Sequence, residues 1–147
     1  MQIRKRSVFA LTALAFSFGL AGFSLAIAGD DDSPLHKSME QVNAKNIFIV
    51  KNLKTPANFK KNQKEIAESA KALATLGKSV RDETEPAKEA KKSQKLWTDL
   101  MDAYVTEADL FATEVVKPDM TQAEAKKKFS AVAGTCTACH KEFRKDD

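Results

Sequence analysis

Four stretches of the chain repeat apolar residues at the spacing of one helix face, and none alternates as a strand does. The first follows Ser33-Pro34, a serine N-cap and a proline suited to the first helical position. It is expected to end at Thr55-Pro56, because the residue before a proline disfavours the α region. Its inward face repeats at spacings of four and three: Leu35, Met39, Val42, Asn46, Ile49 and Leu53. This spacing predicts a helix packed in a bundle.

The next two stretches carry the same periodicity. The second runs over residues 58–80, and the charged residues 81–86, which include a proline, are expected to form a loop. The third starts near Ala87 and is most regular from Leu96 on, until Lys117-Pro118-Asp119 breaks it. Both stretches are therefore predicted to be single helices.

The fourth stretch opens with a capping box, in which Thr121 is the N-cap and Glu124 the third helical residue. Its apolar face again steps by four and three: Ala125, Phe129, Val132, Cys136, Cys139 and Phe143. Four helices with short connections predict an all-α, antiparallel up-down-up-down four-helix bundle. Trp97, the only tryptophan, is expected to be a core anchor.

Residues 136–140 read Cys-Thr-Ala-Cys-His, and Cys-x-x-Cys-His is the attachment pattern of c-type haem. Two thiols three residues apart share one helix face, so both can add to the haem vinyl groups, and the imidazole that follows can ligate the iron. The pentapeptide contains both cysteines and one of the two histidines of the chain. Because it is in register with the inner helix face, the haem is expected in the bundle core.

Three other uses of the cysteines were weighed. A disulfide would suit an exported protein but leaves His140 without a role. A thioredoxin-like pair needs a βαβ context, and no strand pattern precedes Cys136. A zinc site needs four ligands with workable geometry; besides the motif only His36 is available, and the adjacent Cys139 and His140 chelate poorly.

Residues 1–28 have the order of a secretory signal peptide, with Arg4-Lys5-Arg6, an apolar run over 8–25, and the small-residue site Ala26-Ile27-Ala28. Cleavage after Ala28 would leave one domain, residues 29–147. A retained membrane anchor is the alternative, because a run of about eighteen apolar residues is at the edge of spanning length. The acidic segment after the site favours cleavage, and with it a periplasmic location and no stable membrane insertion.

The charge balance of the chain says little about its function. The predicted signal carries three of the 24 basic residues and none of the 20 acidic ones, which leaves residues 29–147 with a net charge of +1. The lysines are expected to be scattered among acids on a solvated surface. Nothing in this balance predicts a nucleic-acid partner.

An exported four-helix chain with this motif in its last helix resembles the cytochrome c′ family, the class II c-type cytochromes. The resemblance covers the mature chain and is most specific over 129–144. It implies that Cys136 and Cys139 hold one covalent haem c, that His140 is the proximal iron ligand, and that Arg144 is a basic residue beside it. Leu35 stands where many members carry an arginine near the haem propionates, so the propionate partner stays open.

The resemblance also indicates what occupies the sixth coordination site of the haem iron. In low-spin members a methionine of the first helix ligates the iron and the protein transfers electrons, and the matching position is Met39. In high-spin members an apolar or aromatic residue of the first helix covers the distal face of the haem, and the iron binds NO or CO. Met39 could instead be a flexible core filler, and His36, one turn earlier, is the other candidate ligand. Met101 and Met120 are expected to pack.

The function expected is that of a periplasmic electron carrier with a buried haem ligated by His140 and Met39. The alternative is a five-coordinate member that binds or scavenges NO or CO. No catalytic constellation is recognised, so an enzyme is not expected. Redox proteins are the expected partners, and a homodimer through the first two helices, involving Phe48 or Val50, is a further expectation from the resemblance.

Overall fold

The structure is a computed structural model that describes residues 33–144. Six helices and no strand make up this part of the chain. Their bounds are α1 Pro34–Asn52, α2 Pro56–Lys61, α3 Gln63–Val80, α4 Glu85–Glu89, α5 Gln94–Glu114 and α6 Gln122–Phe143. The predicted all-α class is confirmed.

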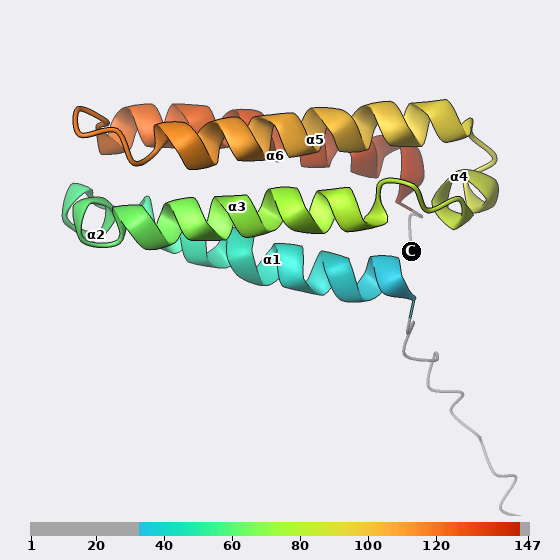
Figure 1. Ribbon diagram of the computed structural model, residues 1–147, viewed down its shortest axis with the longest axis horizontal. Coiled ribbons are helices and arrows are strands. Elements are labelled where there is room, and N and C mark those ends of the chain that lie inside the picture. The colour runs from blue at the N-terminus through green and yellow to red at the C-terminus, as the bar shows by residue number, and fades with distance from the viewer. Residues whose placement is uncertain (1–32, 145–147) are drawn as a thin grey trace, which may run out of the picture. The chain divides into compact units, whose positions relative to one another are not determined.

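The four long helices, α1, α3, α5 and α6, form an antiparallel bundle (Figure 1). α3 packs against both α1 and α5, and α5 packs against α6, whereas α1 and α6 do not form a closely packed pair. The beginning of α1, the end of α6 and the short α4 lie at one end of the bundle, and α2 lies at the other (Figure 1). The end of α6 carries the Cys-x-x-Cys-His sequence, so the motif lies at the α4 end.

Side-chain caps begin the first and the last long helix where the sequence predicts them. The Ser33 hydroxyl accepts a hydrogen bond from the His36 amide at 3.1 Å. At the start of α6, the Thr121 hydroxyl accepts from the Glu124 amide at 3.2 Å, and the Glu124 carboxylate accepts from the Thr121 amide at 3.0 Å. The predicted capping box is therefore confirmed, and it fixes the register in which α6 presents the motif.

The single helix predicted over 58–80 is wrong in its first turns, because the chain breaks at Asn62. The Asn62 side-chain amide donates to the Asn58 carbonyl at 3.0 Å and to the Asn52 side-chain oxygen at 2.8 Å. Asparagine competes in this way with regular helical hydrogen bonding. The break separates α2 from α3, and the hydrogen bond to Asn52 ties the end of α2 to the end of α1.

The loop predicted over 81–86 and the helix predicted from Ala87 are also corrected. Glu85 and Pro86 already belong to the short α4, and α5 begins only at Gln94 with Ser93 as its N-cap. Lys91, between the two, has a φ of 53°, in the left-handed region that ends helices. The bundle thus has two short helices beyond the four predicted.

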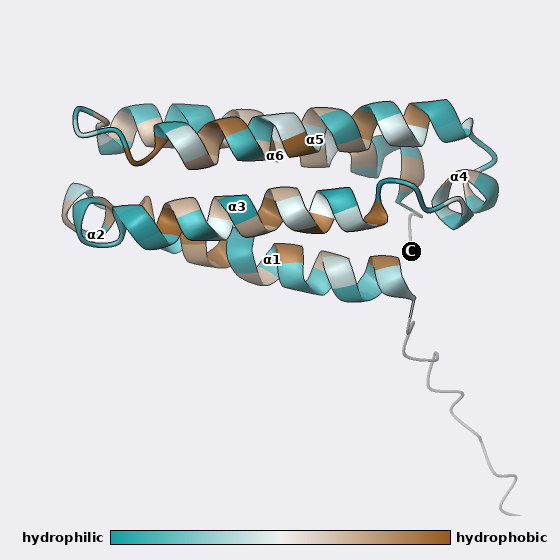
Figure 2. Cartoon of the chain, viewed as in Figure 1, coloured by the Kyte–Doolittle hydropathy of each residue, from teal (hydrophilic) through white to brown (hydrophobic). Residues whose placement is uncertain are grey.

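Apolar residues face inward along the long helices (Figure 2). Trp97 is buried, and its indole N–H donates to the Val80 carbonyl at 3.2 Å, which confirms it as a core anchor. Gly77 of α3 lies so close to α5 that an added Cβ would stand 2.7 Å from the Tyr104 ring. The small residue therefore permits the close approach of the two helices. Among residues 33–144, no helix is both long and apolar enough to cross a membrane.

Candidate functional site

The two cysteines of α6 point into the bundle, as their register predicts. Cys139 is 6% exposed, and Cys136, one turn earlier, is half-buried. Cys136 packs against the main core, defined here as the larger apolar cluster that fills the bundle between α1, α3, α5 and α6. Cys139 belongs to a second, smaller cluster at the α4 end. The motif therefore spans the boundary between two apolar clusters.

The smaller cluster, called the motif cluster below, collects residues from five helices. Its buried members are Val80, Ala87, Trp97, Met101 and Cys139, and its half-buried members are Leu35, Met39, Leu100 and Phe143. The rings of Trp97 and Phe143 meet edge to face, with centroids 5.2 Å apart. Beyond its backbone, the motif cluster offers only apolar surface, sulfur and one indole.

Met39 and Cys139 lie in this same cluster, although 100 positions separate them in the sequence. Met39 comes from the second turn of α1 and Cys139 from the end of α6. Met101, expected from the sequence only to pack, is a second methionine here and is more deeply buried than Met39. Two thioethers therefore lie in the cluster that contains Cys139.

The other candidate residues are on the outside. His140 and Arg144 are exposed, and the Arg144 backbone N–H donates to the His140 carbonyl at 3.0 Å. Arg144 has extended backbone angles and ends α6, so it does not continue the helix face of His140. His36 is exposed, with its ring 3.7 Å from the Glu40 carboxylate. His36 is thus solvent-exposed and is not part of the apolar cluster that contains Met39.

Burial keeps the two thiols in their neutral form. Desolvation raises the pKa of Cys139 to about 11, with a smaller contribution from the neighbouring Cys136. Desolvation likewise raises the pKa of Cys136. Both residues are free thiols, so the disulfide alternative is not realised in this structure. Within residues 33–144, no group of three or more His, Cys, Asp or Glu could hold a metal ion by itself, which leaves the zinc alternative without a ligand set.

Tyr104 is a residue that sequence reasoning missed. It is 4% exposed, and its hydroxyl has no hydrogen-bond partner among the described residues. Burial raises its pKa above the ordinary value, and the nearby Cys136 adds to the shift. Its position seven residues after Trp97, on the same face of α5, was the available signal. An unpaired hydroxyl therefore lies beside the motif, inside an otherwise apolar core.

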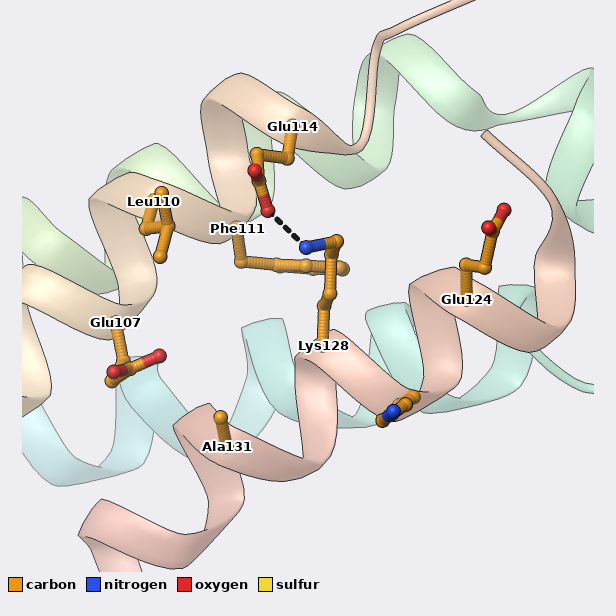
Figure 3. Close-up of a pocket in the computed structure, with 8 residues that line it drawn as sticks. Glu107, Leu110, Phe111, Glu114, Glu124, Lys128 and Ala131 are labelled. Atoms are coloured by element: carbon orange, nitrogen blue, oxygen red, sulfur yellow. Dashed lines mark ion pairs between the residues drawn. The ribbon is translucent and has the colours of Figure 1, made fainter. Parts of the chain in front are cut away.

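A hollow of about 420 Å³ lies elsewhere, between α5 and α6 (Figure 3). Glu114 and Lys128 form an ion pair of 2.5 Å across it, beside the half-exposed Leu110. None of the motif residues lines it. The hollow is a surface feature of the α5–α6 pair and is separate from the candidate site.

A comparison with known families gives one match, to the family described as Cytochrome C', over residues 35–144. The chain belongs to the cytochrome c′ family. Neither the curated proteins nor the solved structures contain a significant match. As a cytochrome c′, the protein is a c-type cytochrome with a covalently attached haem c, and its bundle is the four-helix fold of the family.

The residues at the α4 end fit such a group. A porphyrin is a large apolar ring, and the surroundings of Cys139 are apolar on every helix that reaches it. The two neutral thiols are the groups that form thioethers, and the thioether of Met39 is an accepted axial ligand of haem iron. The unpaired Tyr104 hydroxyl adds a polar donor next to Cys136. The donor set therefore agrees with the cofactor of the family.

Proposed function

We propose that this cytochrome c′ is an electron carrier of the low-spin type, in which Cys136 and Cys139 attach the haem and His140 and Met39 are the axial ligands. The observation that carries the proposal is the presence of Met39 and Cys139 in one apolar cluster, contributed by helices at opposite ends of the sequence. When bound, the haem supplies an iron centre that gains and loses single electrons.

The chain's own residues have separate tasks in this proposal. Cys136 and Cys139 fix the cofactor to α6, and the apolar residues around Cys139 exclude water from it. His140 would hold the iron through its imidazole and Met39 through its thioether, and two protein ligands would favour electron transfer over the binding of a small molecule. Arg144, the exposed residue at the end of α6, would offer a cation to a haem carboxylate.

The test is the absorption spectrum of the oxidised and reduced protein, with and without CO. Met39→Leu keeps the side-chain volume nearly constant, so the bundle should stay folded. We expect it to abolish the weak far-red band of iron–sulfur ligation, to produce a high-spin spectrum, to lower the reduction potential and to open the iron to CO.

Met101→Leu is the matched control, because Met101 is buried in the same cluster but on α5. It should leave the band and the CO response unchanged, as should His36→Ala. Loss of the band in Met101→Leu alone would make Met101 the ligand. A wild-type protein that is high-spin when reduced and binds CO at once would discard methionine ligation and favour the NO- or CO-binding alternative.

Export is part of the same proposal. Members of the family are typically exported, and residues 1–28, which lie outside the described residues, have the order of a cleavable signal. We expect N-terminal sequencing of the protein from the producing cell to begin at Gly29, in the periplasmic fraction. An intact Met1 on protein in the membrane fraction would instead support the retained anchor. Soluble redox proteins are then the expected partners, and no catalysed reaction is proposed.

A further inference from the structure

The charge of the bundle is unevenly distributed between its two ends. Between Glu40 and Glu65 the sequence has no acidic residue, and this segment carries six lysines: Lys45, Lys51, Lys54, Lys60, Lys61 and Lys64. The expectation that lysines are scattered among acids does not hold here. All six are exposed, and none forms an ion pair with the described residues.

The fold gathers most of this charge at the α2 end. The hydrogen bond between Asn62 and Asn52 holds the end of α2 against the end of α1, so the lysines of both helices and of the first turn of α3 share one end of the bundle (Figure 1). The connection between α5 and α6 reaches the same end, since the Gln63 side chain donates to the Lys117 carbonyl at 3.1 Å. This connection contributes one negative charge, Asp119, and one positive charge, Lys117. The balance at this end stays clearly positive.

Two apolar side chains lie among these lysines. Ile47 is 60% exposed and Val50 50% exposed, the two largest values for large apolar side chains among the described residues. Lys51 is four residues after Ile47, so Ile47, Val50 and Lys51 share the outward side of α1, and Lys54 follows just beyond the end of the helix. An exposed helix side that combines lysines with branched apolar residues is the composition of an interfacial membrane contact.

We propose that this basic end, the six lysines with Ile47 and Val50, docks on the surface of a membrane rich in anionic phospholipids. Unpaired lysines are attracted to the negative surface potential, and Ile47 and Val50 would enter the headgroup boundary. The proposal goes beyond electron transfer and does not depend on the identity of the axial ligands.

Two other occupants fit the surface less well. A second copy of the chain in a two-fold dimer would bring six unpaired lysines against six more, which is repulsive. An electron-transfer partner would have to approach the motif, but Met39 and Lys54 are 15 residues apart on α1 and its end, about 22 Å along the axis. Docking through the basic end would instead leave the α4 end free for such a partner.

The experiment measures co-sedimentation of the haem-loaded protein, as isolated, with vesicles of phosphatidylcholine alone and of phosphatidylcholine with phosphatidylglycerol in equal parts. We expect binding to the anionic vesicles only. Raising the ionic strength from about 0.1 M to about 1 M should release the protein, because the Debye length falls from about 10 Å to about 3 Å. Binding through a retained apolar anchor would survive this change and would not require phosphatidylglycerol.

The variant Lys51→Gln with Lys54→Gln should weaken binding by about 25-fold, since each lysine near an anionic surface contributes about fivefold. The matched control is Lys71→Gln with Lys91→Gln, which removes the same charge from exposed, unpaired lysines outside the basic end. An equal loss in both variants, or equal binding to both vesicles, would overturn the proposal. A dimer that Ile47→Ser disperses, without vesicle binding, would assign this surface to a second copy and overturn it as well.

Discussion

The two apolar clusters of the bundle differ in what completes them. The main core is closed by its own side chains: Ile49, Ile66, Leu73, Val115 and Val132 are fully buried in it. Three amide side chains at its α2 end have hydrogen-bond partners. Gln63 donates to the Val115 carbonyl at 2.7 Å, Gln122 to the Leu53 carbonyl at 2.5 Å, and Asn62 to Asn52.

The motif cluster is smaller, and chemistry rather than volume distinguishes it. It contains a free thiol and two thioethers, and four of its members are only half-buried. Where it meets the main core, the second thiol and the unpaired Tyr104 hydroxyl lie near each other. The comparison teaches that the two regions differ in chemistry: the main core is closed by apolar side chains, whereas the motif cluster contains the sulfur atoms that we propose bind the haem. Substitutions in both regions test this division.

The largest effect is expected from replacing both cysteines. Cys136→Ala with Cys139→Ala removes the two attachment points, so mass spectrometry after acid denaturation should find no haem on the chain. Much of the bundle should also unfold, because the haem supplies a large part of the apolar contacts of a small core. Circular dichroism would measure the loss of helix. Haem mass on the double variant would contradict the assignment of the motif.

Leu73→Ala provides the comparison from the main core. Leu73 is fully buried, so truncation leaves a cavity and should lower the free energy of unfolding by about 2–5 kcal/mol. Covalent haem should nevertheless remain, since Leu73 is outside the motif cluster. Denaturant unfolding gives the stability and mass spectrometry the haem content. Loss of haem together with stability in Leu73→Ala would mean that the two ends are not separable.

A smaller effect is expected at the contact between α3 and α5. The Cβ of Gly77→Ala would stand 2.7 Å and 2.9 Å from two Tyr104 ring carbons and 2.9 Å from a Val105 methyl carbon. A packed ring cannot yield as a flexible chain end does, so the helices must separate, at a cost of about 1–3 kcal/mol. The thermal unfolding midpoint should fall accordingly.

Gly134→Ala is the control for helix propensity. A Cβ at Gly134 meets nothing within 4 Å, and the residue is exposed on α6. Alanine should therefore raise the stability by about 0.5–1 kcal/mol. Changes of opposite sign in the two variants would separate crowding from propensity. A gain in stability at Gly77 would show that α3 and α5 are less closely packed than described.

The smallest effect concerns the surface between α5 and α6. The hydrogen bond from Lys128 holds the pKa of Glu114 below its ordinary value of 4.5, and Lys117 adds to the shift. The ion pair therefore stabilises the fold at pH values above the ordinary pKa, and this stabilisation is lost as the pH falls through the lowered pKa. Glu114→Gln should lose less thermal stability than the wild type between about pH 6 and about pH 3.

The control for this titration is Glu65→Gln, at an exposed position without an ion pair among the described residues. It should follow the wild-type pH profile. A wild-type slope in Glu114→Gln would mean that the pair with Lys128 contributes nothing to stability at either pH.

Several features were predictable from sequence because they depend on neighbours three or four residues away. The side chains of Ser33 and Thr121 begin their helices by accepting a hydrogen bond from the backbone amide three residues later. The register of α6 turns both cysteines inward. The Cys-x-x-Cys-His spacing and the periodicity of α1 also sufficed to place Met39 on the packed side of its helix and to indicate the family. The roles of the site residues stay predictions, since their support is position and chemistry.

Other features depend on parts of the chain that are distant in sequence. Asn62 breaks the second helix partly because Asn52, ten residues earlier, accepts its amide, and Gly77 matters only because the Tyr104 ring packs on it. The presence of Met39 and Cys139 in one cluster, and the gathering of lysines at the α2 end, follow from how the helices pack and turn. Local periodicity assigns each residue to a face, but only tertiary packing decides which faces meet, because that choice is made by contacts between helices.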